Sequence, residues 1–360
     1  MKSKRVTIYD IADELSMSAS YVSRALNNHP LVNQEIRDRV KKKALELNYK
    51  YNSHAANLRQ GSTKTIGVIV PHIDQSFFSG VIAGIEQICF QHNYGLVICQ
   101  SHESFKQECL AVETLIHQNV ACILISVSAE TQSYAHLESI KQHNIDLIQF
   151  DRCIDKLDSY KVLNDNNETS FNVVNTLVEQ GYKRIAFLGG PEHLNVFKDR
   201  KEGYLKAIKH AVLSIPYNFI VDNVLSKEKA VQVAKELLSL KETPDAFLTV
   251  SDHQSLGVLQ IANSLGIPVP QQLGIFGFAN EAFAEIIQPS LSSVDQKNKE
   301  MGEHTANLYF KNILHRKDNT PPFFREEIIK CEIIIRESSM GMSADLSDPI
   351  NNYYKQTSIT

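Results

Sequence analysis

The spacing of hydrophobic residues changes near residue 60. Before residue 50, apolar residues recur every three or four positions, which is the spacing of amphipathic helices. Three short helices are predicted there, each behind a residue suited to capping a helix, namely Thr7, Ser18 and Asn33. Only residues 16–18 separate the first two. This pattern is therefore typical of a helix-turn-helix unit, whose second helix enters the major groove of DNA.

Beyond a polar stretch of small residues, apolar strands alternate with amphipathic helices. Strands are predicted at 65–70, 95–99, 121–126, 146–150, 183–188, 246–250 and 273–278. Helices are predicted at 78–92, 106–118, 134–143, 168–180, 199–209, 226–240 and 254–265. Such regular alternation indicates parallel sheets that helices cover on both faces.

The alternating part is too long for a single sheet. It spans about 275 of the 360 residues, and the Asn- and Asp-rich segment 162–170 marks the expected change between two Rossmann-like lobes. We predict a helix-turn-helix domain at 1–50, a hinge at 51–64, a core at 65–339 and a mobile tail at 340–360. Lobe 1 is expected at about 65–163 and 291–320, and lobe 2 at about 164–290 and 321–339. Ligands of open parallel sheets bind beyond the carboxyl ends of the strands, so the loops there are the expected site.

Composition excludes several classes of protein. With 43% hydrophobic and 22% charged residues, the chain is neither disordered nor collagen-like. No apolar run approaches the ~20 residues of a membrane-spanning helix. The basic start leads into Tyr9 and Asp10 instead of the apolar segment of a secretory signal, so a cytoplasmic location is expected. The six cysteines form no C-x-x-C pair and lie largely in apolar segments, which favours reduced core thiols.

Charge divides the chain as the hydrophobic pattern does. Residues 1–60 carry 11 Lys and Arg against 6 Asp and Glu, a net charge of +5, and the remainder carries 26 against 35, a net charge of −9. This division indicates a small module that binds a polyanion, joined to a body that does not. A chance surplus of lysine in one helical domain is the alternative.

Eight stretches, in their order and spacing, resemble a known family. They are Val-Thr-Ile-Tyr-Asp-Ile-Ala (6–12), Ser-Arg-Ala-Leu-Asn (23–27), Glu-Leu-Asn-Tyr (46–49), the segment 52–58, Ile-Gly-Val-Ile-Val-Pro (66–71), Phe-Phe-Ser (77–79), Gly-Tyr-Lys-Arg-Ile-Ala-Phe-Leu-Gly-Gly-Pro (181–191) and Gly-Ile-Pro-Val-Pro (266–270). From residue 6 to about 339 the chain resembles the lactose-repressor/galactose-repressor family of bacterial transcription regulators.

The resemblance implies both a fold and a mechanism. The fold is an N-terminal all-α helix-turn-helix DNA-binding domain followed by an α/β core, which is like a periplasmic binding protein and consists of two Rossmann-like lobes. The mechanism is that of a homodimeric repressor. It binds a pseudo-palindromic, double-stranded operator and is switched by a small-molecule effector held between the lobes.

The helix behind Ser18 is expected to contact base edges. Its early residues Ala19, Ser20 and Arg24 are placed for this, and the Arg24 guanidinium can pair with O6 and N7 of guanine for about 1–3 kcal/mol of discrimination. A phosphate contact or a surface ion pair is the alternative for Arg24. The expected DNA-binding residues are Thr7, Ser18, Ala19, Ser20, Ser23, Arg24, Asn27, Asn33, Tyr49, Asn52, Ala55, Asn57 and Leu58.

The hinge carries its own expectation. In the family it coils on the operator, and a leucine from each subunit enters the minor groove and kinks the central base step. Leu58 occupies that position, and Ala55 is a small residue where the paired hinge helices approach. An apolar wedge offsets unstacking because the bent DNA offers a wider contact surface. The alternative is that Leu58 packs between head and body. A short polar linker is expected to be disordered away from DNA, so that its ordering is the switchable step.

By position, the family's effector contacts fall mostly on loops after strands. They are Phe77, Phe78, Ser126, Asp151, Arg200, Asp252, Asn280 and Gln296, with Arg152 beside Asp151. Aromatic faces that stack on a sugar ring and charged groups that bind hydroxyls suit a carbohydrate or its derivative. Each residue also has a structural alternative, such as helix capping for Asp252, a solvated helix position for Arg200 and core packing for the phenylalanines.

The chain departs from the family pattern at two places in this site. Ala279 follows Gly277 and Phe278, where the family usually carries an aspartate, so an acceptor for a sugar hydroxyl is missing. Gln75 and Ser76 replace the Asn-Pro that often precedes the double phenylalanine. Both departures weaken the transfer of any particular family effector to this chain.

Two other classes of protein share part of this pattern. A solute-binding receptor without DNA function would share the two-lobed body, but it would begin with a signal peptide instead of a basic helical head. An enzyme is disfavoured because the sequence has no G-x-S-x-G, H-E-x-x-H, Walker lysine loop or helix-initiating G-x-G-x-x-G. No cofactor, metal or membrane partner is expected.

Overall fold

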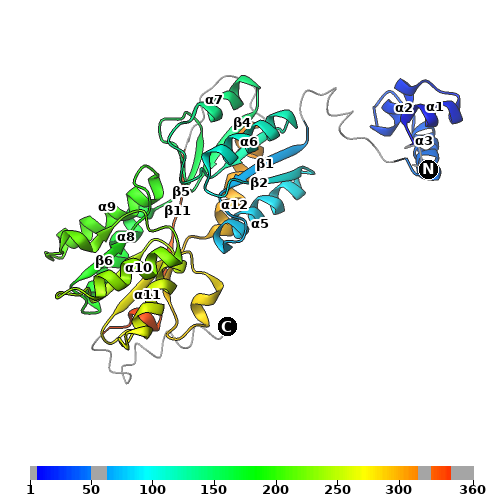
Figure 1. Ribbon diagram of the computed structural model, residues 1–360. Coiled ribbons are helices and arrows are strands. Elements are labelled where there is room, and N and C mark those ends of the chain that lie inside the picture. The colour runs from blue at the N-terminus through cyan, green and yellow to red at the C-terminus, as the bar shows by residue number, and fades with distance from the viewer. Residues whose placement is uncertain (1–5, 50–62, 315–325, 342–360) are drawn as a thin grey trace. The chain divides into compact units, whose positions relative to one another are not determined.

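The computed structural model describes residues 6–49, 63–314 and 326–341 (Figure 1). The chain divides into two compact units, Met1–Thr63 and Lys64–Thr360. Most of the predicted hinge and nearly all of the predicted tail lie outside the described residues, as do Asn52, Ala55, Asn57 and Leu58. Within the described part, no helix is both long and apolar enough to cross a membrane.

The described part of the first unit, residues 6–49, contains three helices: α1 (Ile8–Leu15), α2 (Ala19–Leu26) and α3 (Gln34–Glu46). Ser18 caps α2 by accepting a hydrogen bond from the Tyr21 amide, and Asn33 caps α3 by accepting one from the Ile36 amide. The buried core is made of the periodic apolar residues, among them Ile11, Val22 and Val40. The turn after α1 places Ser16 at φ 52°, in the left-handed region. The helix-turn-helix prediction is confirmed.

Lobe 1 is built on a six-stranded parallel sheet in the order β11-β5-β4-β3-β1-β2. Its strands are β1 (Thr65–Val70), β2 (Gly95–Gln100), β3 (Cys122–Ile125), β4 (Asp146–Phe150), β5 (Tyr160–Asn164) and β11 (Glu326–Ile329). The apolar residues of α6 (Phe105–His117) and α7 (Ala135–Gln142) cover one face of the sheet. Those of α5 (Ser76–Gln91) and α12 (Asn298–Asn307) cover the other.

Lobe 2 repeats this architecture with the strand order β12-β10-β9-β8-β6-β7. Its strands are β6 (Ile185–Leu188), β7 (Ile220–Val221), β8 (Ala246–Thr249), β9 (Gly274–Phe278), β10 (Ser292–Asp295) and β12 (Glu332–Ile334), of which only β12 is antiparallel to its neighbour among the described strands. Helices α8 (Asn166–Glu179) and α9 (Asn195–His210) cover one face. Helices α10 (Lys227–Leu238) and α11 (Asp252–Ser264) cover the other. The predicted fold class is confirmed.

Three connections join the lobes, and two of the predicted boundaries were wrong. The chain passes between the lobes after β5, after β10 and after β11. The first change falls inside the predicted segment 162–170. Lobe 1 does not resume at 291, because β10 pairs with β9 and β12 of lobe 2. Lobe 2 does not resume at 321, because β11 pairs with β5 of lobe 1. Each misplaced strand is four residues long, too short for its pattern to select a sheet.

The six cysteines are free thiols. Cys89, Cys122 and Cys153 are buried, and the other three are partly buried. Burial raises the pKa of Cys89 to about 12, so this thiol is protonated at neutral pH. The burial of these three thiols agrees with the apolar segments in which they lie.

Candidate functional site

The loops beyond the carboxyl ends of the strands carry unusual backbone conformations. After β2, His102 and Glu103 have φ values of 52° and 60°, and after β4 Asp151 has a φ of 57°. In lobe 2, Ala279 follows β9 at φ 109°. Positive φ is uncommon for residues other than glycine, and such conformations concentrate at functional sites. These loops lie beyond the carboxyl ends of the strands, which is where open parallel sheets bind ligands.

Two buried opposite charges, one from each lobe, form the centre of the candidate site. Asp151 of lobe 1 is 5% exposed, and Arg200 on α9 of lobe 2 is 4% exposed. Ser126, at the end of β3, donates a hydrogen bond to Asp151 Oδ2 at 3.4 Å. Arg200 donates through Nε to Asn166 Oδ1 and through Nη1 to the Val250 carbonyl, both at 2.8 Å.

These two charges influence each other's ionisation. Burial raises the pKa of Asp151, and the guanidinium groups of Arg152 and Arg200 oppose that rise. Burial lowers the pKa of Arg200 to about 10, against the opposing effect of Asp151. Arg200 is therefore charged near neutral pH, and a charged group in a buried setting binds polar ligands strongly.

Aromatic rings lie beside the two guanidinium groups. The Arg152 Cζ atom lies 5.7 Å from the Phe78 ring centroid and 5.4 Å from that of Phe197. The Arg200 Cζ atom lies 4.1 Å from the Phe278 ring centroid. Phe77 packs edge-on against Phe78 inside the core of lobe 1. Flat apolar faces beside charged hydrogen-bonding groups are the features of a small-molecule site.

Three predicted effector residues direct their side chains elsewhere. Asp252 accepts hydrogen bonds from Ser293 Oγ at 2.6 Å and from the Glu281 amide at 2.8 Å. Asn280 Oδ1 accepts a hydrogen bond from Arg336, and Gln296 Nε2 donates one to Asn164. The structure thus groups Phe78, Ser126, Asp151 and Arg200, while Asp252, Asn280 and Gln296 bond within lobe 2 or at the crossovers.

The structure adds Glu103 to the candidate site. Its carboxylate accepts hydrogen bonds from Arg152 Nη1 at 2.9 and 2.8 Å and from the Ala129 amide at 2.7 Å. Glu103 therefore holds the loops after β3 and β4 and orients the Arg152 guanidinium. It follows a correctly predicted strand, so the rule that the site lies beyond strand ends could have found it.

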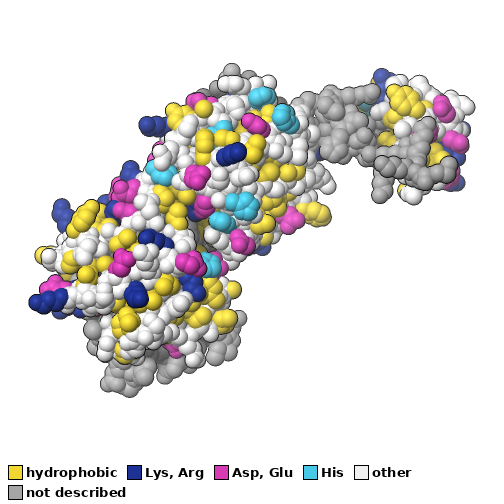
Figure 2. All heavy atoms as spheres, in the orientation of Figure 1, with side chains coloured by type: hydrophobic (Ala, Val, Ile, Leu, Met, Phe, Trp, Pro, Cys, Tyr) yellow, Lys and Arg dark blue, Asp and Glu magenta, His cyan; other side chains and the backbone are white. Residues whose placement is uncertain are grey.

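In the first unit, none of the described residues predicted to bind DNA is buried. Ser18 and Asn33 cap helices, and Asn27 Nδ2 donates a hydrogen bond to the Ser23 carbonyl. The exposed guanidinium of Arg24 makes no hydrogen bond or ion pair with any residue that the structure describes. On the core, by contrast, basic and acidic side chains are interspersed over the face shown in Figure 2, without a continuous basic patch.

Comparison with known proteins gives this arrangement a family. Residues 7–52 match the family model described as "Bacterial regulatory proteins, lacI family", and residues 174–339 match the one described as "Periplasmic binding protein-like domain". The HTH-type transcriptional repressor CytR of Escherichia coli (strain K12) is 30% identical over 347 residues, which cover 95% of this chain and 100% of that protein. The chain belongs to the lacI family of bacterial regulatory proteins.

Solved structures agree with this lacI-family assignment at the level of the fold. The lac repressor dimer bound to operator and the anti-inducer ONPF aligns with a TM-score of 0.81 at 19% identity, over 94% of this chain and 100% of that chain. The complex of the transcriptional regulator CelR with cellobiose aligns with a TM-score of 0.70 at 22% identity, over 93% of this chain and 100% of that chain. The resemblance inferred from the sequence of this lacI-family protein is confirmed.

Proposed function

We propose that this protein is a sequence-specific DNA-binding transcriptional repressor whose operator affinity is set by a small molecule bound between its lobes. The observation that carries the proposal is that two buried ionisable groups, Asp151 of lobe 1 and Arg200 of lobe 2, are close enough for each to influence the pKa of the other. A ligand that binds both groups contacts both lobes, and its binding free energy therefore depends on how the lobes are arranged. Differential binding of this kind shifts the equilibrium between two conformations.

The effector we propose is a sugar or a sugar derivative. Carboxylate and guanidinium groups bind hydroxyls in pairs, and the buried rings of Phe78 and Phe278 lie beside the guanidinium groups of Arg152 and Arg200. The structural relative CelR is described in complex with cellobiose. Ala279 brings no carboxylate to the loop after β9, so the proposed contacts centre on Asp151 and Arg200.

The proposed partner of the first unit is a pseudo-palindromic operator. A homodimer presents two copies of α2 to half-sites about one helical turn apart. We place the protein in the cytoplasm, where the DNA is, and assign it no catalytic role, cofactor or metal. A solute receptor without DNA function is the alternative, and the three-helix unit with its unpaired, exposed Arg24 among the described residues disfavours it.

Replacement of Arg24 tests the DNA-binding half of the proposal. Arg24→Ala should remove the preference for one base pair in each half-site, a loss of about 1–3 kcal/mol on the preferred operator, because a bidentate guanine contact is lost. Arg39→Ala, also exposed but on α3, is the matched control. Affinities for an operator series, selected from random duplexes, measure the effect. If Arg24→Ala loses the same affinity on every sequence, Arg24 contacts phosphate instead of a base. If the unaltered protein shows no sequence preference at all, the proposed function is wrong.

A thermal-shift screen of the full chain tests the effector half. Sugars, sugar acids, sugar phosphates and nucleosides are the probes, since a ligand that binds only the folded state raises the melting temperature. Arg200→Lys keeps the positive charge but loses the planar fork of donors, so it should abolish the shift. A shift of equal size in the variant would place the ligand elsewhere, and the absence of any shift would contradict effector binding by these classes.

A further inference from the structure

One asparagine side chain joins the two lobes through the backbone. Asn195, the first residue of α9 in lobe 2, is 8% exposed. Its Oδ1 accepts a hydrogen bond from the Cys153 amide at 2.8 Å, and its Nδ2 donates one to the Asp151 carbonyl at 2.9 Å. Both partners belong to the loop after β4 in lobe 1. The amide thus uses a donor and an acceptor at once on the backbone of the other lobe.

The side chain between those two partners makes a second contact across the lobes. Arg152 is held by Glu103 of lobe 1, and its guanidinium lies within cation–π distance of Phe197, two residues after Asn195. The Phe197 ring packs directly against Gly190, where the Cβ atom of any other residue would lie only 2.5 Å from the ring. The loop of residues 151–153 and the start of α9 therefore meet at three polar points.

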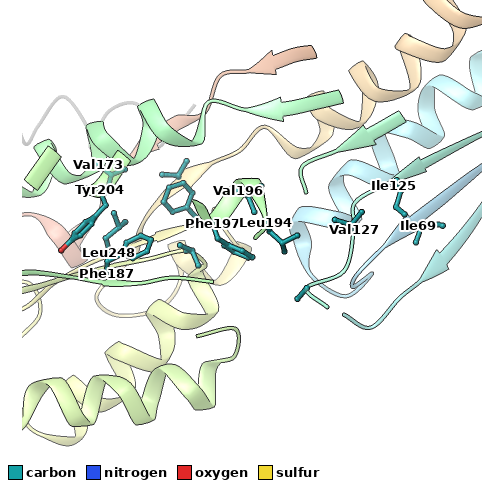
Figure 3. Close-up of a cluster of buried hydrophobic side chains, with 14 of the residues drawn as sticks. Ile69, Ile125, Val127, Val173, Phe187, Leu194, Val196, Phe197, Tyr204 and Leu248 are labelled. Atoms are coloured by element: carbon teal, nitrogen blue, oxygen red, sulfur yellow. The ribbon is translucent and has the colours of Figure 1, made fainter. Parts of the chain in front are cut away.

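Apolar residues complete this interlobe contact. Leu194 and Val196 flank Asn195, and both belong to the buried cluster that contains Ile69 and Val127 of lobe 1 (Figure 3). Leu194 is fully buried, as are Ile69 and Val127. Water is thereby kept from the Asn195 hydrogen bonds, and shielded hydrogen bonds are electrostatically stronger than exposed ones.

We propose that Asn195 is the polar centre of a latch, formed by residues 194–197 of lobe 2 and 151–153 of lobe 1, which sets how often the lobes adopt the arrangement seen here. The latch acts through the chain's own atoms, so it goes beyond the proposed function and does not depend on any effector or on DNA. Removing the amide leaves the Cys153 amide without its acceptor and leaves the Asp151 carbonyl with only the weak Cys153 Sγ donor at 3.8 Å. In an open arrangement water can bind both backbone groups. The equilibrium therefore moves toward the open arrangement by about ten- to thirtyfold, the change expected for two net hydrogen bonds.

Single-molecule energy transfer on the full chain measures this equilibrium. Dyes are attached through non-natural amino acids at Glu113 on α6 of lobe 1 and Lys209 on α9 of lobe 2, which are exposed helix positions. This labelling leaves the six native thiols untouched. Asn195→Ala should raise the ratio of low-transfer to high-transfer molecules ten- to thirtyfold over the unaltered protein.

Two further variants make the result decisive. Asn195→Ser keeps a hydroxyl that can satisfy one of the two partners, so its shift should be smaller than that of the alanine variant. Asn172→Ala makes the same truncation on the exposed face of α8 and should leave the ratio unchanged. An unchanged ratio in Asn195→Ala, or equal shifts in Asn195→Ala and Asn172→Ala, overturns the latch. Because no DNA or effector is present, this outcome is independent of whether the proposed function holds.

Discussion

The buried carboxyl group of Asp252 predicts a pH dependence of folding stability. Burial raises its pKa from 3.8 to about 7, although hydrogen bonds from Ser293 and the Glu281 amide oppose the rise. In the unfolded chain this carboxyl ionises near pH 3.8, so between pH 3.8 and pH 7 the folded state binds more protons than the unfolded state. The free energy of unfolding therefore falls as the pH rises through that window and levels off above pH 7.

The size of the effect follows from the difference between the two pKa values. At about 1.4 kcal/mol per pH unit, the part of the window between pH 5 and pH 7 amounts to about 3 kcal/mol. Asp252→Asn removes the titration while keeping the shape of the side chain. Its amide can still accept from Ser293, but its NH₂ group faces the Glu281 amide. The variant should therefore be less stable than the unaltered protein at pH 5 and should regain about 3 kcal/mol relative to it by pH 8.

Urea unfolding of both proteins from pH 5 to pH 8 measures this change. Groups that the two proteins share contribute equally to both free energies of unfolding and cancel in the difference. Glu242→Gln, at an exposed carboxylate with no hydrogen bond or ion pair to the described residues, is the control for removal of a carboxylate. If the difference between the Asp252→Asn protein and the unaltered protein is constant across this range, the folded Asp252 does not titrate in the window and the reasoning is wrong.

Two further predictions concern packing and the hinge. Gly302→Ala should lower the free energy of unfolding by about 1–3 kcal/mol, because the new Cβ would lie 2.0 Å from the Val81 carbonyl oxygen and force α12 away from α5. Gly95→Ala is the control, since its new Cβ would lie 3.7 Å from the nearest atom. A similar loss of stability in both variants would argue against this packing account. Leu58→Ala, outside the described residues, should weaken specific operator binding and remove the DNA bend in a circular-permutation mobility assay, whereas an unchanged bend would rule out the apolar wedge.

The sequence predicted the elements whose information is local. Residues 65–70 and 146–150 are apolar runs bounded by polar residues, and both are strands with those limits. Strands β10 and β11 were not predicted, because Ser-Ser-Val-Asp and Glu-Glu-Ile-Ile carry no decisive alternation over four residues. Their lobe is decided by pairing with strands far away in the sequence. The boundary errors at 291 and 321 have this single cause.

The sequence also predicted some residues of the candidate site and missed others. The resemblance to the family predicted Ser126 and Asp151 as effector contacts on loops after strands, and the structure joins them by a hydrogen bond. Asn195 was missed because the helix that it begins was predicted to start at 199, and its role depends on a loop of the other lobe. Asp252, at the first position of α11, accepts a hydrogen bond from Ser293 because β10 lies in lobe 2. The predicted boundaries had placed β10 in lobe 1. Errors in topology therefore became errors about side-chain partners.

Asp151 links the candidate site to the proposed latch through a single residue. Its carboxylate is paired with Ser126 and faces the charges of Arg152 and Arg200, while its carbonyl oxygen accepts the hydrogen bond from Asn195. Both groups belong to the same residue, whose backbone lies in the narrow left-handed region at φ 57°. A ligand that draws the carboxylate toward itself and shifts the Asp151 backbone also moves the carbonyl oxygen to which Asn195 donates. Effector binding and lobe arrangement would then be coupled within one residue, without a pathway of intermediate side chains.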